Sequence, residues 1–376
     1  MKSLFWISVV TLAYTYLGYA GWLWLRAHWR RLPVRSAACT PMLSIVLVVR
    51  NEANVLEAKL QNLLALDYPQ DHFEIVVTSD GSNDGTNEIL SRYSGNGRIR
   101  VIVQSAPRGK AAGLNDAIKA AKGDLIVFTD ARQKIEAAAL RRLADNFSDP
   151  TIGCASGELM LGDPQTGEVT TRMGLYWRIE KRIRELESAS GSVVGATGAL
   201  YAVRRSLLVP VPPGTILDDV YIPMNVVRQG SRVIFDSSAR AWDVADQGAD
   251  REFSRKVRTL SGNYQLLQIA PWLLGRKNPI WFEFVSHKLL RLAAPFALVM
   301  ALIASLFLIH ESAYRIALAL QLGFYGLCLV AMTRLARGPV ARAADAAFTF
   351  VVLNTAAAVA FALFVTGRRT AWGINC

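Results

Sequence analysis

Four long apolar stretches without a charged residue stand out along the chain, at 3–25, 292–309, 316–333 and 346–367. A helix needs about 20 apolar residues to cross the hydrocarbon core of a bilayer, so each stretch is long enough to span a membrane. Residues 40–275 mix polar and apolar positions as a water-soluble protein does. The pattern therefore predicts a soluble domain that follows one membrane helix and precedes three others.

Within the soluble stretch, short β-branched runs alternate with segments of helical periodicity. Strands are expected at 44–49, 73–78, 99–103 and 125–129, and helices at 55–66, 87–93 and 113–121. This alternation predicts an α/β fold in which helices wrap a mainly parallel sheet.

Polar residues follow three of the expected strands directly. Asn51 and Glu52 come after the first strand, Asp80 after the second and Asp130 after the fourth. Ligands of parallel sheets bind beyond the carboxyl ends of the strands, where the strand order reverses. Asp80 with Gly81 is also a common turn pair. The arrival of the whole set at one rim nevertheless indicates a binding site.

Composition agrees with a membrane protein, since 52% of the residues are hydrophobic and only 19% are charged. The net charge of +12 comes largely from basic residues beside the apolar stretches: Arg26, Arg30, Arg31, Arg35, Arg334, Arg337, Arg342, Arg368 and Arg369. Such flanking charge is typical of a cytoplasmic membrane face, so membrane lipid is an expected partner and nucleic acid is not.

The same charges give an orientation. The arginines after the first stretch place 40–275 in the cytoplasm and the N-terminus outside. Four helices would then put the C-terminus outside, whereas Arg368 and Arg369 favour the inside, so the side of the C-terminus stays open.

The first stretch also allows a signal peptide, with Lys2 as its basic start and Gly18-Tyr19-Ala20 as its cleavage site. The apolar run continues through Leu25 into a basic cluster, which favours an uncleaved helix. The four cysteines are widely spaced and predict neither a disulfide framework nor a zinc site.

These boundaries divide the chain into four parts. Residues 1–39 are expected to form the first membrane helix and its basic flank, 40–270 the soluble domain, and 292–376 a region of three membrane helices. Between them, 271–291 mixes aromatic and basic residues and is expected to lie flat on the membrane, with His287 at lipid headgroups.

Seven motifs make the interpretation specific. They are NE at 51–52, DGSNDGT at 80–86, GKAAGLN at 109–115, TDAR at 129–132 and GATGA at 195–199, followed by DD at 218–219 and RKVR at 255–258. Together they resemble a family 2 inverting glycosyltransferase with a GT-A fold. The later motifs resemble the membrane-bound branch that contains cellulose, chitin and hyaluronan synthases.

The resemblance implies a nucleotide-sugar donor, expected to be a UDP-sugar, held by Asn51, Glu52, Asp80 and Lys110. In the family, an Asp-x-Asp motif holds a divalent cation, Mg²⁺ or Mn²⁺, on the donor diphosphate. Asp130 stands at its first position as the metal ligand. Arg132 replaces the second aspartate, which removes an oxygen ligand, adds a cation that can pair with phosphate, and leaves metal dependence open.

The resemblance also implies the remaining roles. Asp219 is the expected catalytic base beside Asp218, because adjacent carboxylates raise each other's pKa. Asp218 could instead cap the helix that follows it. Arg258 is expected to neutralise the leaving diphosphate, although Thr259 stands where synthases carry a tryptophan. Gly195, Thr197 and Gly198 are expected to border the acceptor.

These observations favour a bacterial inner-membrane transferase, with its catalytic domain in the cytoplasm, that moves a sugar to a lipid-linked or polysaccharide acceptor for cell-surface polysaccharide. Export proteins are possible partners. Two alternatives remain: a processive synthase that also translocates its product, and a non-catalytic nucleotide-sugar-binding subunit, since Arg132 and Thr259 depart from the pattern.

Overall fold

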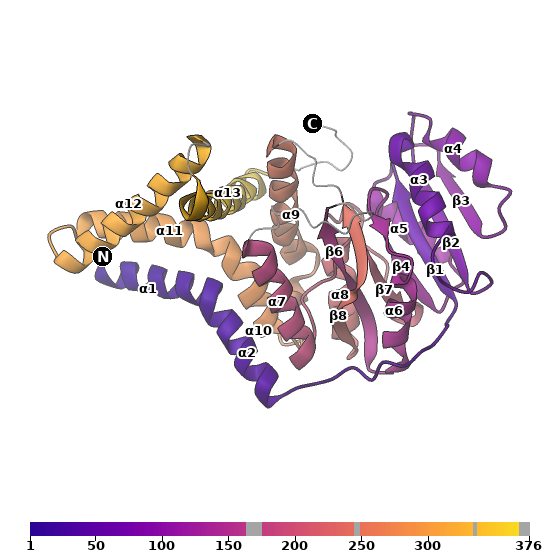
Figure 1. The fold of residues 1–376 in the computed structure, drawn as a ribbon, viewed down its shortest axis with the longest axis horizontal. Coiled ribbons are helices and arrows are strands. Elements are labelled where there is room, and N and C mark those ends of the chain that lie inside the picture. Colours follow the sequence, from indigo (N-terminus) through magenta and orange to yellow (C-terminus); the bar gives the residue numbers. More distant parts are fainter. Residues whose placement is uncertain (163–174, 244–248, 334–336, 368–376) are drawn as a thin grey trace.

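The structure is a computed structural model that describes residues 1–162, 175–243, 249–333 and 337–367. Of the basic residues beside the apolar stretches, Arg334, Arg368 and Arg369 lie outside these ranges. One end of the molecule is a layered α/β domain and the other is a group of long helices, with α7 and α9 between them (Figure 1).

The first part of the domain follows the predicted alternation of strands and helices. Its elements are β1 (Leu43–Val49), α3 (Ala53–Leu64), β2 (Phe73–Asp80), α4 (Thr86–Tyr93), β3 (Ile99–Gln104), α5 (Lys110–Ala120) and β4 (Leu125–Phe128). β1 is buried along its whole length, because helices cover both faces of a central strand.

The second part adds strands and the helices that face the membrane helices. Its elements are β5 (Lys134–Ile135), α6 (Ala139–Asp145), β6 (Ile152–Leu161), α7 (Leu175–Ser190), β7 (Tyr201–Arg204), α8 (Asp218–Arg228), β8 (Arg232–Asp243) and α9 (Ala249–Ile269). Short 3-10 turns lie at Asn146–Ser148, Arg205–Leu207 and Pro271–Leu274.

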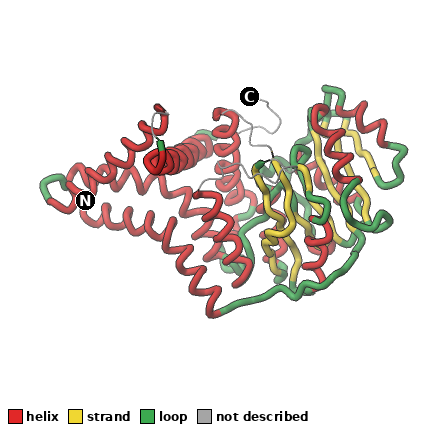
Figure 2. The backbone as a smooth tube through the Cα atoms, viewed as in Figure 1, coloured by secondary structure: helices red, strands yellow, loops and turns green. Residues whose placement is uncertain are grey.

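In the described residues, eight strands form one sheet in the order β3-β2-β1-β4-β7-β6-β8-β5 (Figure 2). The pairs β2–β3, β1–β2, β1–β4 and β6–β8 are parallel, whereas β7 runs antiparallel to both β4 and β6, and β5 to β8. The α/β class and the parallel strands to β4 are as predicted, and the second half makes the sheet mixed. The strand order reverses between β1 and β4, where a ligand site is expected.

Two apolar cores lie on opposite faces of this sheet. One gathers Leu56, Leu60 and Leu63 of α3 against β1 and β2. The other joins the far face of β1 and β4 to α8 and continues into Leu273, Ile280 and Phe284. Because Phe284 belongs to a long apolar helix, the soluble domain and the membrane region share one core.

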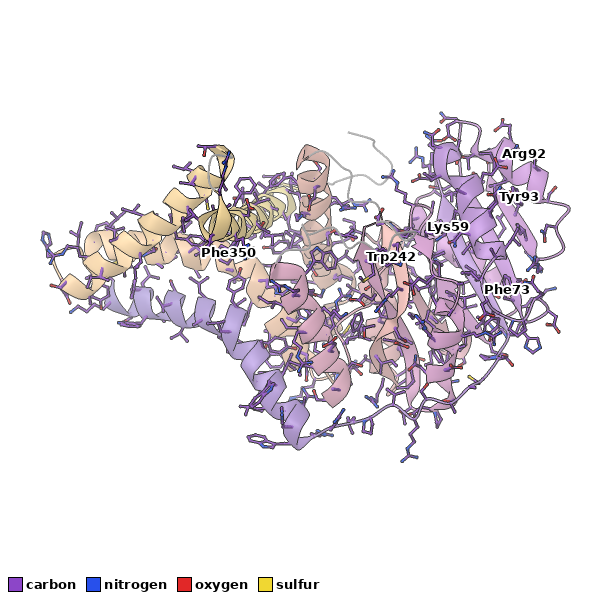
Figure 3. The ribbon with its side chains drawn as sticks, in the orientation of Figure 1. Lys59, Phe73, Arg92, Tyr93, Trp242 and Phe350 are labelled. Atoms are coloured by element: carbon purple, nitrogen blue, oxygen red, sulfur yellow. The ribbon has the colours of Figure 1, made fainter. Side chains whose placement is uncertain are left out.

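Within the described ranges, four helices are long and apolar enough to cross a membrane: 2–29, 281–307, 312–333 and 338–365. The first consists of α1 (Lys2–Ala13), a π-helical turn (Tyr14–Gly18) and α2 (Tyr19–Trp29). The second consists of α10 (Trp281–Phe284), a π-helical turn (Val285–Leu289) and α11 (Leu290–Phe307), and α12 (Ser312–Thr333) and α13 (Gly338–Val365) follow. Figure 3 labels Phe350 of α13 among these helices, at the other end from Phe73 of β2.

The second of these helices begins earlier than expected. Residues 281–291, expected to lie flat on the membrane, are the first turns of the helix that continues to Phe307. Burial explains the difference, since Glu283, Phe284, Ser286 and His287 all pack inside the protein. The aromatic and polar residues of this segment make contacts with the soluble domain.

The turn before β4 leaves no room for a side chain at Gly123, so a larger residue there should lower the stability of the protein. A Cβ atom at Gly123 would lie 2.5 Å from the Ser44 nitrogen and 2.6 Å from the Leu43 carbonyl carbon, both backbone atoms of the central strand. Gly123→Ala should therefore destabilise the protein by about 1–3 kcal/mol, the usual cost of overpacking, and lower the melting temperature in detergent. Gly97→Ala is the matched control, because nothing lies within 4 Å of a Cβ there. Equal melting temperatures for the two variants would contradict the close approach.

Candidate active site

The loops after β1 and β2 form one wall of the candidate site. Asn51 adopts a left-handed conformation (φ 54°) that asparagine tolerates. Its side-chain oxygen accepts the Asn83 N–H at 2.9 Å, and its own N–H donates to the Ser82 hydroxyl at 3.2 Å. The two loops are thereby locked together at the rim predicted from the sequence.

Asp80 organises the loop that leads to Lys110. Its carboxylate is fully buried and accepts backbone N–H groups from Arg108 at 2.6 Å and Gly109 at 3.0 Å. Gly109 has a φ of 91°, a conformation that favours glycine. Asp80 therefore fixes the start of α5, and with it the position of the Lys110 side chain.

Lys110 connects two of the predicted acidic residues. Its ammonium lies 3.1 Å from Asp130 Oδ1, at the end of β4, and 3.2 Å from Asp218 Oδ1, at the start of α8. Burial opposes the charge of Lys110, but the carboxylates of Asp130, Asp218 and Asp219 outweigh it and raise the pKa of this lysine. Three distant segments meet at this one cation.

Asp219 follows on the first turn of α8 and is half-buried. Burial and the neighbouring Asp218 carboxylate raise the pKa of Asp219 to about 6, against the opposing charge of Lys110. The alternative that Asp218 caps α8 is wrong: the capping position is Leu217, its side chain makes no capping hydrogen bond, and Asp218 binds Lys110 instead.

Two glycines of the loop 193–199 let it pack against Asp219. A Cβ at Gly198 would lie 3.2 Å from Asp219 Oδ2, and one at Gly195, where φ is 90°, would lie 3.3 Å from the Asp219 carbonyl oxygen. The Ala196 N–H donates to that same carbonyl at 2.7 Å. Gly195, Gly198 and Asp219 are thus brought together.

Thr197 faces a different neighbour, the helix α7. Its hydroxyl accepts a hydrogen bond from Arg184 at 2.6 Å. Both residues line a pocket with Glu158, Trp177, Glu180 and Phe235. The pocket borders the loop behind Asp219.

Arg132 turns toward the loop after β1. Its guanidinium lies 3.5 Å from Glu52 Oε1, and about half of the Arg132 side chain is exposed. The residue that replaces the second aspartate is therefore a cation at the open rim, paired with a carboxylate that the sequence also selected.

The chain is similar in sequence to proteins of known family. Residues 44–209 match the profile described as Glycosyl transferase family 2. The poly-beta-1,6-N-acetyl-D-glucosamine synthase of Staphylococcus aureus strain MSSA476 is 26% identical over 236 residues, and that of Staphylococcus epidermidis is 24% identical over 241 residues. The matches cover 60% and 61% of this chain but only 55% and 56% of the two relatives.

This match identifies residues 44–209 as a glycosyl transferase family 2 domain. The GT-A fold expected from the motifs is confirmed by a mannosyltransferase from Pyrobaculum calidifontis, solved in complex with GDP-Man and Mn²⁺. That structure matches with a TM-score of 0.75 at 22% identity, over 97% of this chain and 100% of its own.

The family 2 match ends before two of the predicted functional segments. Asp218, Asp219 and Arg258 lie beyond residue 209. The structure brings the first two to Lys110, as described above. Arg258, on α9, makes no hydrogen bond or ion pair with another residue that the structure describes.

α9 nevertheless docks directly on the segment before Asp218. Gln265 accepts the Ile216 N–H at 2.9 Å and donates to the Gly214 carbonyl at 2.8 Å. A Cβ at Gly262 would lie 2.6 Å from Leu217 Cγ, so only glycine permits this approach. Arg258 stands one helical turn from Gly262 on the same face of α9.

Lys59 is a functional candidate that the sequence analysis missed. Figure 3 labels it on α3 beside the sheet. Its buried amine donates to the Thr129 hydroxyl at 2.8 Å and the Gln133 carbonyl at 2.7 Å, and so holds both ends of the loop that carries Asp130 and Arg132. A lysine on the apolar stripe of Leu56, Leu60 and Leu63 was the available signal.

Lys59 predicts a pH dependence of stability. Burial lowers its pKa from 10.5 to about 7 in the folded protein. Between these values unfolding takes up a proton, so Lys59 makes the wild type more stable as pH rises from 7 toward 10, by up to about 1.4 kcal/mol per pH unit. In Lys59→Met, melting temperatures at pH 7, 8 and 9 should rise less steeply. Lys119→Met, at an exposed position of α5, should keep the wild-type slope; a wild-type slope in Lys59→Met would refute the assignment.

Proposed function

We propose that this protein is a membrane-bound inverting glycosyltransferase that moves a sugar from a nucleotide sugar to a lipid-linked or glycan acceptor. The observation that carries the proposal is Asp219: a half-buried carboxylate with a pKa raised to about 6, beside a lysine that joins the end of β4 to the start of α8. A base must be unprotonated near neutral pH and still able to accept a proton, and this pKa meets both needs.

The transfer is a single displacement. The acceptor hydroxyl oxygen attacks the anomeric carbon of the donor, the bond from that carbon to the diphosphate oxygen breaks, and Asp219 takes the hydroxyl proton. Attack from the side opposite the leaving group inverts the anomeric configuration. One carboxylate suffices for this route, which distinguishes it from a double displacement through a covalent sugar intermediate.

Cations around the site receive the leaving diphosphate. Lys110 sits inside the site, Arg132 stands at its rim, and Arg258 lies on the helix that docks beside Asp218. Fixed positive charge lowers the barrier by stabilising the negative charge that develops on the leaving group. Asp80, Asn51 and Glu52 contribute by holding the loops that carry these groups and the nucleotide. We propose a UDP-sugar as the donor.

A divalent cation fits this site only together with the donor. The Pyrobaculum mannosyltransferase holds Mn²⁺, and Asp130, with 43% of its side chain exposed, is the residue that would hold Mg²⁺ or Mn²⁺ here. In the part of the chain that the structure describes, no group of three or more His, Cys, Asp or Glu side chains could bind a metal. Diphosphate oxygens would supply further ligands, and the bound cation would neutralise diphosphate charge.

The acceptor is expected at the pocket between α7 and Thr197. Trp177 offers an aromatic face there, and Gly195 and Gly198 let the bordering loop reach Asp219. The staphylococcal relatives are named as polysaccharide synthases, which favours a growing glycan or its lipid-linked precursor. We place the protein in a bacterial inner membrane with the catalytic domain in the cytoplasm, because arginines flank the first apolar helix on that side.

The base assignment predicts a separation of binding from turnover. Purified protein should release nucleoside diphosphate from one member of a panel of nucleotide sugars, and Asp219→Asn should lower kcat by about 100-fold or more while keeping the donor Kd. Wild-type kcat should fall about tenfold per pH unit below pH 6, because protonated Asp219 cannot accept a proton. Asp71→Asn, at a largely exposed carboxylate outside the site, is the control. A matching loss of donor affinity in Asp219→Asn would make Asp219 a binding residue.

The metal proposal predicts that the divalent cation binds only after the nucleotide has bound. Calorimetric titration with Mn²⁺ should show no binding to the free protein and clear binding once UDP is present, because Asp130 is the sole proposed protein ligand. Asp130→Asn should lose the UDP-dependent binding, and chelator should abolish turnover. Full activity in chelator would show that Lys110 and the arginines handle the diphosphate without a metal.

A further inference from the structure

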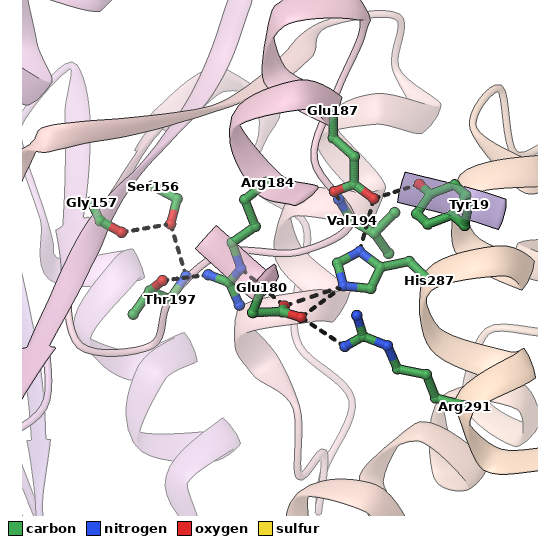
Figure 4. A network of polar contacts seen from close by, with 10 residues as sticks. All are labelled: Tyr19, Ser156, Gly157, Glu180, Arg184, Glu187, Val194, Thr197, His287 and Arg291. Atoms are coloured by element: carbon green, nitrogen blue, oxygen red, sulfur yellow. Dashed lines mark hydrogen bonds and ion pairs between the residues drawn. The ribbon is translucent and has the colours of Figure 1, made fainter. Parts of the chain in front are cut away.

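A buried cluster of charged residues lies where the soluble domain meets two membrane helices (Figure 4). The His287 ring, from the helix 281–307, stands between Glu187 at 2.8 Å and Glu180 at 3.2 Å, both on α7. Tyr19, from the first membrane helix, donates its hydroxyl to Glu187 at 2.6 Å. Arg291, one turn after His287, pairs with Glu180 at 2.7 Å.

Basic neighbours favour the ionised form of the two carboxylates in this cluster. Burial disfavours ionised carboxylates, but Arg291 and His287 lower the pKa of Glu180 well below its usual range, and His287 lowers that of Glu187. Each ring nitrogen of His287 lies within hydrogen-bond distance of a different carboxylate, so the imidazole bridges Glu187 and Glu180. His287 and Glu187 are each 1% exposed, so water contributes little to their solvation.

The cluster also reaches the loop that packs against Asp219. The second oxygen of Glu187 accepts the Val194 N–H at 3.3 Å. Glu180 pairs with Arg184 at 3.3 Å, and Arg184 donates to the Thr197 hydroxyl at 2.6 Å (Figure 4). Between these two attachment points, Ala196 donates its N–H to the Asp219 carbonyl at 2.7 Å.

Apolar packing alone would hold α7 against the first membrane helix, as Leu23, Ile183 and Leu186 already do. Buried ion pairs add little stability compared with apolar groups of the same size, because desolvation offsets their attraction. Their hydrogen bonds are directional, however, and fix the relative position of the groups they join. This cluster fixes two membrane helices, α7 and the loop 193–199 relative to one another.

We propose that this cluster is a positioning device through which the membrane helices set the loop that supports Asp219, with Tyr19 and His287 as positioning residues. The proposal rests on the proposed function, in that Asp219 must be the base for its position to matter. It gives the membrane helices a part in turnover in addition to anchoring.

Tyr19→Phe is the sharpest test, because it removes one hydroxyl from the cluster and keeps the aromatic ring in the apolar contact. We expect kcat to fall about 3- to 10-fold with the donor KM and Kd unchanged. Tyr14→Phe is the matched control: its hydroxyl lies 2.9 Å from the Ser286 hydroxyl and links the same two helices, with no hydrogen bond to α7 in the described residues. The control should keep the wild-type kcat.

A double-mutant cycle separates positioning from general damage. If Tyr19 acts through Asp219, Tyr19→Phe should cause no further loss of kcat in the Asp219→Asn background. His287→Gln should behave like Tyr19→Phe with a larger loss of kcat and, again, an unchanged donor Kd. Wild-type kinetics in Tyr19→Phe, or equal losses in Tyr19→Phe and Tyr14→Phe, would overturn the proposal. Absence of transfer by the wild type would instead refute the proposed function.

Discussion

The ion pairs of Lys110 with Asp130 and Asp218 are the interaction on which the site depends. Asp130 follows β4, Asp218 begins α8 almost ninety residues later in the chain, and Lys110 begins α5. Without the ammonium between them, two carboxylates would face each other in a partly buried space, at a high electrostatic cost. Its charge also opposes the rise in the pKa of Asp219.

Two further devices place this lysine and its partners. Asp80 holds the backbone at the start of α5, and Lys59 holds both ends of the loop that carries Asp130. Both side chains are buried, and their hydrogen bonds hold loops in position. The groups at the open rim, Arg132 and Glu52, are in contrast partly exposed and accessible to a ligand.

The membrane helices are joined to the domain that carries the site by two physically different kinds of contact. The apolar core on one face of the sheet extends into Phe284, which attaches the domain without specifying fine detail. The cluster of Tyr19, Glu187, His287 and Glu180 adds directional hydrogen bonds at the same junction. Burial of apolar surface thus attaches the domain to the membrane helices, and the hydrogen bonds fix their relative position.

Local pattern by itself determined the α/β alternation up to β4, the apolar helices and the acidic residues at the strand ends, because periodicity, chain length in the bilayer and turn chemistry are properties of neighbouring residues. Pattern did not determine the antiparallel β7, whose partners β4 and β6 lie far along the chain. It also misjudged 281–291, since aromatic and basic residues suit a membrane surface and a buried junction equally. Only the tertiary structure decided that His287 meets two carboxylates of α7, that Asp218 binds Lys110 and does not cap its helix, and that Lys59 faces a polar loop. Each of these depends on which distant charge packs opposite, and that is fixed when the sheet and helices assemble.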